Sequence, residues 1–354
     1  MADEGRRVID RRLLSPENGL IAAVMAMRYG GGPPVPDPRI DWTAFVARVR
    51  QHRIALWIDT AALRAAAMPA PAALKLMRLH AAERQRWDLF EAETLRLAEA
   101  FAGAGIDLLV LKGAGLSALL YGGRCLRVAR DIDLLVRPED APAALALLRG
   151  LGYDDRAAGT VRHHNAVEIR HADTAMPVEL HVRFDDAEAL FPTARARPFE
   201  TAIEVAVRAG RLRTLGRELA IVYAAYHGTK HFWRRLFWLG DIAEAMRAPD
   251  VDWREAFAMA RRIGVDRHLA LALVLARGLL DAAMPPAAAP AMALLQSGAE
   301  RDAWTMRAVL AVPDFLDEPA LRRRMGRFAY ARWTIGLLRN WRARAAQLGL
   351  WLGV

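Results

Sequence analysis

The sequence predicts an α+β fold that is predominantly helical, with a small mixed sheet between two helical regions. Apolar residues recur at helical spacing in the first hundred residues and again after residue 215, in segments rich in alanine, leucine and arginine. Between these regions, from Ile106 onward, short apolar runs alternate with turn residues and short helical patterns. We therefore expect an N-terminal helical region over residues 1–87, an α/β core over 88–200 and a C-terminal helical region over 201–354.

Composition restricts the class of protein. The chain has 354 residues, of which 54% are hydrophobic and 25% charged, a balance typical of a folded chain rather than a disordered one. Its single cysteine, Cys125, excludes an intramolecular disulfide and a cysteine-based zinc cluster, so we expect a reducing cytoplasm. The first residues lack the apolar stretch of a signal peptide, and no run is long enough for a transmembrane span. The net charge of +10 permits an anionic partner without specifying one.

The N-terminal region reads as three helices. Ser15 followed by Pro16 is typical of an N-cap and a first helical position, and the apolar pattern that follows ends at the glycines after Tyr29. Asp41 can cap a second helix, and a longer helical pattern covers residues 71–101.

The central region alternates between strands and helices. Its apolar runs predict strands over residues 106–111, 130–136, 165–171 and 177–184, and its periodic segments predict helices over 113–121 and 138–150. A loop rich in glycine and arginine fills residues 122–130. This order of elements is typical of a compact mixed α/β unit.

Acidic side chains on two of these strands predict a metal site. Successive side chains of a strand point to opposite faces, so Asp131 and Asp133 project together, and Glu179 and His181 also share a face. An isolated pair of aspartates is most simply a solvated strand end. If the two strands are neighbours, however, three carboxylates converge, and hard divalent ions prefer such oxygen ligands. We therefore expect a magnesium site that handles phosphate groups.

A phosphate-binding turn precedes these acids. Lys112 and Gly113 lie between a predicted strand and a predicted helix, where free backbone amides attract phosphate. Ser117 lies one turn into that helix and could add a hydroxyl group. Arg127 and Arg130 could neutralise a triphosphate from the following loop, or could simply pair with nearby acids. The Lys112 ammonium could contact phosphate or stay in solvent.

These motifs, taken together, resemble the uncharacterised nucleotidyltransferase family of the DNA polymerase β-like superfamily. The resemblance covers about residues 88–184 and rests on the following segments: Leu111-Lys112-Gly113, Tyr121, Arg130-Asp131-Ile132-Asp133-Leu134-Leu135-Val136, Gly152-Tyr153 and Val178-Glu179-Leu180-His181. It implies a nucleotidyltransferase core in which Gly113 belongs to the nucleotide-binding motif. Asp131 and Asp133 would be the metal ligands and Glu179 the third acidic residue. Two departures concern Ala114, where serine or a second glycine is usual, and Glu179, where aspartate is usual.

The resemblance implies transfer of a nucleotidyl group, AMP from ATP being the expected case, with Mg²⁺ or Mn²⁺ and release of pyrophosphate. Glu179 could assist deprotonation of the acceptor. The sequence does not identify the acceptor, which could be a small molecule, a sugar, a protein or a nucleic-acid end. Four residues are candidates for the acceptor pocket. His181 lies on a predicted strand, and a polar helical segment contributes His227, His231 and Asp241. The two helical histidines do not form a zinc protease motif, because Gly228 replaces the required glutamate.

Two alternatives remain. Ala114 favours a catalytically silent protein that binds nucleotide for regulation, although the intact acids favour catalysis. The C-terminal stretch from Arg322 to Trp351 mixes arginine with tryptophan and could bind RNA or an acidic membrane surface. A packed terminal helix with a solvated basic face is the simpler interpretation, so a nucleic-acid partner is not favoured.

Overall fold

The computed structural model divides the chain into two compact units. One comprises Met1–Glu83 and Ile221–Arg344, and the other comprises Arg84–Ala220 and Ala345–Val354. The structure describes residues 9, 11–65, 67–154, 165–295, 298, 326, 333–338 and 341–352. The division into three parts at residues 88 and 200 stays a prediction.

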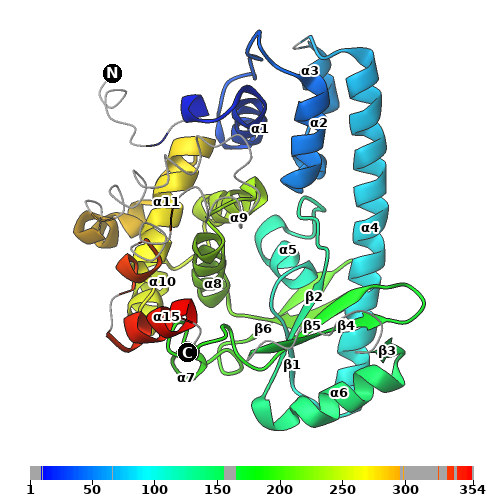
Figure 1. Cartoon of the computed structure of the whole chain (residues 1–354), viewed down its shortest axis with the longest axis vertical. Helices are drawn as coiled ribbons and strands as arrows, with labels where there is room; N and C mark the ends of the chain where they lie inside the picture. Colours follow the sequence, from blue (N-terminus) through cyan, green and yellow to red (C-terminus); the bar gives the residue numbers. More distant parts are fainter. Residues whose placement is uncertain are drawn as a thin grey trace. The chain divides into compact units, whose positions relative to one another are not determined.

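The second unit contains a seven-stranded sheet of order β3-β4-β5-β2-β1-β7-β6 (Figure 1). The strands are β1 (Leu108–Val110), β2 (Ile132–Val136), β3 (Tyr153–Asp154), β4 (Ala166–His171), β5 (Pro177–His181), β6 (Ile203–Val207) and β7 (Gly210–Thr214). The sheet is mixed, because β2 pairs in parallel with β5 and β1 with β7, whereas the other pairs are antiparallel. Strands β1 and β2 are buried along their whole length, as their apolar sequences predict.

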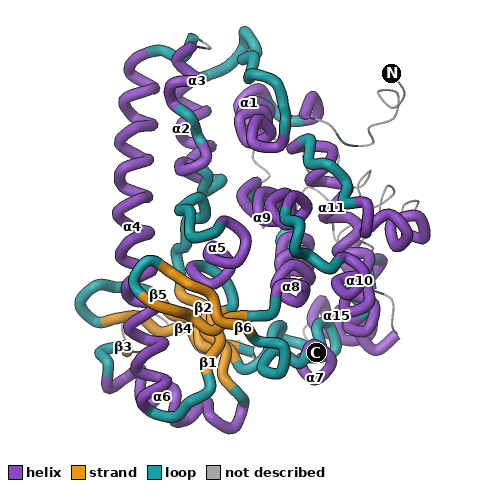
Figure 2. Tube along the Cα trace, turned by 180° about the vertical axis from the view of Figure 1, so that it is seen from behind, coloured by secondary structure: helices purple, strands orange, loops and turns teal. Residues whose placement is uncertain are grey.

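Helices of the same unit pack around this sheet (Figure 2). They are α4 (Ala70–Gly103, in this unit from Arg84 on), α5 (Ala114–Tyr121), a short 3₁₀ turn with α6 (Pro138–Asp140 and Ala141–Gly150) and α7 (Thr193–Ala196). Helix α4 contacts strands toward both ends of the sheet. The Tyr153 hydroxyl of β3 donates to Glu93 at 2.6 Å, and a Cβ at Gly210 of β7 would lie 2.9 Å from Leu95.

The first unit is helical. Its described helices include α1 (Pro16–Ala26), α2 (Trp42–Gln51), α3 (Thr60–Ala65), the part of α4 before Arg84, the part of α8 (Arg217–Lys230) after Ala220, α9 (Leu236–Arg247), α10 (Trp253–Ile263), α11 (Asp266–Leu280) and the part of α15 (Trp341–Leu352) up to Arg344. The predicted caps are present: Ser15 accepts from the Asn18 amide, and Asp41 accepts from the amides of Thr43 and Ala44. Along α11 almost every residue from His268 to Leu280 is buried, so this helix forms the centre of the unit's core.

His52, at the end of α2, joins three helical segments of this unit. Its Nε2 lies 2.9 Å from Asn18 Oδ1, and its Nδ1 accepts from the Leu236 amide at 3.2 Å. The ring is fully buried, and burial together with the nearby Arg235 and Arg48 guanidiniums lowers its pKa to about 3. His52 therefore stays neutral near pH 7 and carries one hydrogen-bond donor and one acceptor.

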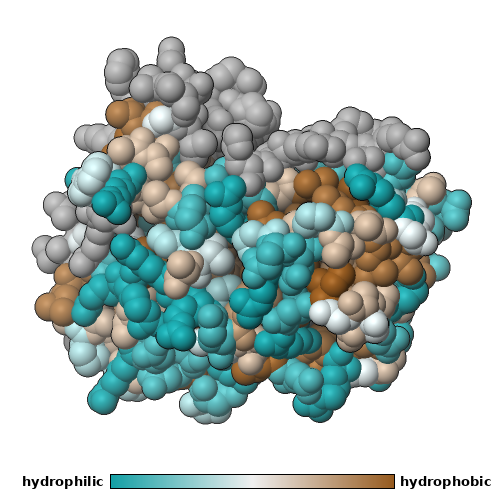
Figure 3. Space-filling view, turned by 90° about the horizontal axis from the view of Figure 1, so that it is seen from below, coloured by the Kyte–Doolittle hydropathy of each residue, from teal (hydrophilic) through white to brown (hydrophobic). Residues whose placement is uncertain are grey.

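The predicted fold class, α+β and predominantly helical with a mixed sheet, is confirmed. The predicted strands appear with shorter bounds, whereas β3, β6 and β7 were not predicted. Within the described ranges, no helix combines the length and apolarity needed to cross a membrane. The face seen in Figure 3 is mostly hydrophilic, with smaller hydrophobic patches. Within the predicted basic C-terminal stretch, residues 322–325, 327–332, 339 and 340 lie outside the described residues, and residues 341–352 form α15 (Trp341–Leu352).

Candidate functional site

A tight turn connects β1 to α5 and begins the site. Gly113 has φ +59° and ψ −122°, a conformation that side-chain-bearing residues rarely adopt. Two residues later, a Cβ on Gly115 would lie 2.7 Å from the Thr214 hydroxyl oxygen, so glycine lets α5 approach β7 closely. Among the described residues, no side chain caps the first turn of α5, and free amides at a helix start attract anions.

Asp133 and Glu179 lie side by side on neighbouring strands. They are register partners in the parallel pair β2 and β5, as the alternation of the two strands predicts. Asp133 is almost completely buried, at 3% exposure, whereas the Glu179 side chain is 32% exposed. The inner carboxylate is therefore fixed by the core, and the outer one reaches solvent.

A lysine and a histidine contact the inner carboxylate. The Lys112 Nζ lies 2.8 Å from Asp133 Oδ1, and the His181 Nε2 lies 3.3 Å from the same oxygen and 3.3 Å from Glu179 Oε2. Both of these basic side chains are themselves largely buried. Asp133, Glu179 and His181 each offer a ligand atom, and these atoms all lie within 4.8 Å of one another.

The electrostatics of this cluster favour an ionised carboxylate. Burial alone raises the pKa of Asp133, but the Lys112 charge and the His181 hydrogen bond outweigh burial and lower the pKa well below its ordinary value. Burial alone lowers the pKa of His181, whereas its hydrogen bonds to Asp133 and Glu179 raise it, and the net shift is upward. Asp133 is thus a permanent anion at neutral pH.

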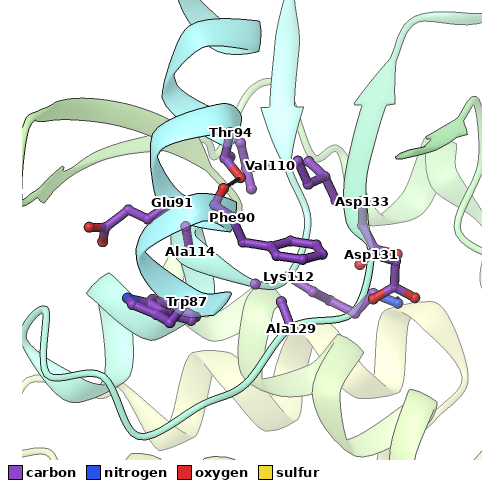
Figure 4. A pocket seen from close by; sticks show the side chains of 12 residues that line it. Trp87, Phe90, Glu91, Thr94, Val110, Lys112, Ala114, Ala129, Asp131 and Asp133 are labelled. Carbon is purple, nitrogen blue, oxygen red and sulfur yellow. Dashed lines mark hydrogen bonds and ion pairs between the residues drawn. The ribbon is translucent and has the colours of Figure 1, made fainter. Parts of the chain in front are cut away.

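A pocket adjoins the cluster (Figure 4). Its walls come from α4, from the Lys112–Gly113 turn and from the start of β2, and the lining residues are Trp87, Phe90, Glu91, Thr94, Val110, Lys112, Gly113, Ala114, Ala129, Asp131, Ile132 and Asp133. The Phe90 ring reaches from α4 toward Lys112 and Asp131, whereas the Glu91 carboxylate points away from them (Figure 4). Asp131 stands one residue before β2 and lines the same pocket as Asp133.

Sequence reasoning missed the wall that α4 contributes. Trp87, Phe90, Glu91 and Thr94 follow the spacing i, i+3, i+4, i+7, which places them on one face of the helix. The same spacing is typical of any helix that packs on a core, so the signal was present but not specific to a pocket.

The other predicted nucleotide-binding residues lie nearby in the sequence but do not line this pocket. Ser117 is fully buried, and its hydroxyl donates to the Arg124 carbonyl at 3.4 Å. Arg127 is buried and Arg130 half-buried, both in the segment that precedes β2.

Three of the predicted acceptor-pocket residues belong to the helical unit, whereas His181 belongs to the cluster already described. The rings of His227 and His231 have centroids 4.7 Å apart, and the Trp238 ring contacts both. Asp241 is buried on α9, one turn after Trp238. The two histidines and Trp238 therefore form a local cluster of rings.

A family model described as "Uncharacterised nucleotidyltransferase" matches residues 38–281, which include every residue of the cluster and of the pocket. No curated protein matches the chain.

Proposed function

The chain belongs to this nucleotidyltransferase family, and on that basis we propose that it transfers a nucleotidyl group from a nucleoside triphosphate to an acceptor hydroxyl and releases pyrophosphate. ATP is the proposed donor. The observation that carries the proposal is the pairing of Asp133 with Glu179 on adjacent strands, directly beside the Lys112–Gly113 turn. The reducing cytoplasm is the proposed compartment, because the chain has a single cysteine.

The proposed cofactor is a divalent cation, Mg²⁺ or Mn²⁺. The donor set fits such an ion, because an ionised, buried aspartate and a partly exposed glutamate offer hard oxygen ligands within 4.8 Å of each other. Asp133 and Glu179 would hold the ion, with Asp131 as a further ligand from the pocket rim. When bound, the ion would neutralise charge on the phosphates as they react.

The protein's own groups have distinct proposed roles. The acceptor oxygen would form a bond to the α-phosphorus while the bond to the β-phosphate oxygen breaks, and pyrophosphate would leave with that electron pair. Glu179, the more exposed acid, would take the proton of the acceptor hydroxyl.

The Gly113 turn and the amides of α5 would hold the phosphates. Arg127 and Arg130 are further proposed phosphate contacts. Ser117 would join them only by releasing the Arg124 carbonyl.

The acceptor is proposed only as a hydroxyl compound. His181, His227, His231 and Asp241 stay the proposed acceptor-pocket residues. A small molecule, a sugar, a protein or a nucleic-acid end would each supply the required hydroxyl group.

The direct test uses a nucleoside triphosphate labelled at the α-phosphate, with Mg²⁺ or Mn²⁺ and a fractionated cell extract as the source of acceptors. We expect metal-dependent label transfer and pyrophosphate release. Asp133→Asn and Glu179→Gln should lower the rate at least about a hundredfold, because each removes charge at the reacting phosphates. Glu204→Gln removes a carboxylate from the exposed edge strand β6 of the same unit and should leave the rate unchanged.

Two results would oppose the proposal. Label transfer that survives both site substitutions would separate the activity from this cluster. Tight nucleotide binding without label transfer or pyrophosphate release, across all extract fractions, would favour the catalytically silent alternative.

A further inference from the structure

One oxygen atom carries most of the charge interactions in the cluster. Asp133 Oδ1 lies 2.8 Å from the Lys112 ammonium and 3.3 Å from the His181 Nε2. Only 2% of the Asp133 side chain is exposed, so water contributes little to neutralising it. The Lys112 side chain, at 14% exposure, is therefore the main positive charge that compensates this buried carboxylate.

A divalent cation at Asp133 and this ammonium group would compete. A carboxylate oxygen has two lone pairs, and here both have cationic or hydrogen-bonding neighbours. A cation that coordinates Oδ1 must take one of these positions, and an ammonium kept about 3 Å from the same oxygen would repel it strongly in a site with little water. Binding of the metal at this oxygen is therefore favoured when Lys112 moves away from it.

The fold provides a destination for the displaced ammonium. Lys112 directly precedes Gly113 and the uncapped amide end of α5, where the phosphates are proposed to lie. Its backbone is held at the end of β1, since the adjacent Leu111 amide donates to the Asp133 carbonyl at 3.0 Å. The long flexible side chain can thus exchange a carboxylate for a phosphate without backbone movement.

We propose that Lys112 is the internal counter-cation of Asp133, which blocks the metal site in the absence of nucleotide and moves onto the triphosphate when metal and nucleotide bind together. This inference rests on the proposed function. It gives Lys112 a positioning and regulatory role, because the metal alone would bind weakly and the two ligands would strengthen each other's binding. Such coupling is reciprocal between the two ligands.

The test measures Mn²⁺ binding by the loss of the electron paramagnetic resonance signal of free Mn²⁺, on the full chain without turnover. Titrations are made with Mn²⁺ alone and with Mn²⁺ plus an ATP analogue whose α,β-bridge is methylene. The variants are Lys112→Met, which keeps the length of the side chain, and Lys112→Gln, which keeps a hydrogen-bond donor without the charge. Lys75→Met removes one exposed positive charge elsewhere and is the matched control.

We expect both Lys112 variants to bind Mn²⁺ alone about tenfold more tightly than the unmodified chain, within the usual range of coupling between sites. The analogue should strengthen Mn²⁺ binding in the unmodified chain and in Lys75→Met, and much less in the Lys112 variants. The Lys112 variants should also bind the analogue more weakly.

Mn²⁺ affinity that is equal or lower in both Lys112 variants would overturn the inference. The proposed function would still stand in that case if Asp133→Asn abolished Mn²⁺ binding. Absence of Mn²⁺ binding by the unmodified chain, even with the analogue, would instead overturn the metal site and the proposed function with it. A Lys112→Met chain that fails to fold, checked by circular dichroism, leaves Lys112→Gln to decide.

Discussion

Asp133 is the residue on which the electrostatics of the site depend. Its carboxylate is buried, register-paired with Glu179 and surrounded by Lys112 and His181. The Lys112 charge and the His181 hydrogen bond outweigh burial and lower the pKa of Asp133, so its carboxylate is ionised at neutral pH. The proposed metal ion would therefore bind Asp133 without displacing a proton from its carboxyl group.

A substitution of Gly113 should change the stability of the fold. Gly113→Ala should lower the free energy of unfolding by about 1–3 kcal/mol, because φ +59° with ψ −122° is strained for any residue with a Cβ. The added methyl has room, since its nearest neighbour is the Ala129 Cβ at 3.7 Å, so the cost comes from the backbone. Urea denaturation followed by circular dichroism measures the change.

The matched control is Gly103→Ala at the end of α4. A Cβ there has no atom within 4 Å and no positive φ, so stability should stay the same or rise slightly. Equal stability of the Gly113 and Gly103 variants would show that the turn relaxes without cost, and would remove the argument that glycine is needed to shape the phosphate-binding turn.

At the scale of elements, the sequence predicted those whose local pattern is strong. The start of a capped helix, such as the one after Asp41, and the bounds of a strand buried on both sides, such as β2, were predicted within a few residues. The unpredicted β6 has four of its five residues exposed or half-buried, and β7 alternates arginine with buried residues. Their strand conformation depends on pairing with each other and with β1, which a local pattern does not contain.

The candidate site was predictable to a similar degree. The order of Gly113, Asp133 and Glu179 along the chain indicated an acidic cluster beside a turn, and the register of β2 with β5 brings the two acids together. The contacts of the two basic side chains were not predictable. The alternation of side chains along a strand cannot show that His181 Nε2 lies between the two carboxylates, or that the Lys112 ammonium contacts Asp133. Those contacts depend on rotamers that only packing selects.

The helical unit allows a prediction about pH. The folded-state pKa of His52, about 3, lies below its unfolded value near 6.5, so below pH 6.5 the unfolded chain binds a proton that the folded chain does not. The free energy of unfolding should therefore fall as pH falls from about 6.5 toward 3, by up to about 1.4 kcal/mol per pH unit from this residue. Buried His268, whose pKa burial also lowers to about 3, should add to the slope.

Urea titrations between pH 7 and pH 4 would measure this slope. His52→Gln keeps a hydrogen-bonding side chain without the titration and should give a shallower dependence on pH. His80→Gln replaces an exposed histidine of the same unit and is the control. A slope in His52→Gln as steep as in the control would show that protonation of His52 does not limit stability in acid.

In the molecule as a whole, the residues proposed to bind the metal and the phosphates all lie in one unit. The acidic cluster, the glycine turn and the pocket all lie within Arg84–Ala220, and the family match extends beyond this segment into both helical parts. The central claim is therefore local: Asp133 and Glu179 hold the divalent cation that a nucleotidyl transfer requires.

A crystal of the chain grown with Mn²⁺ and the methylene-bridged ATP analogue tests this claim most directly, through the anomalous scattering of manganese. The account predicts a peak within about 2.0–2.6 Å of a carboxylate oxygen of both Asp133 and Glu179, beside the phosphates of the analogue. A peak bound to other residues, or an analogue bound away from the Gly113 turn with no metal at this cluster, would contradict it.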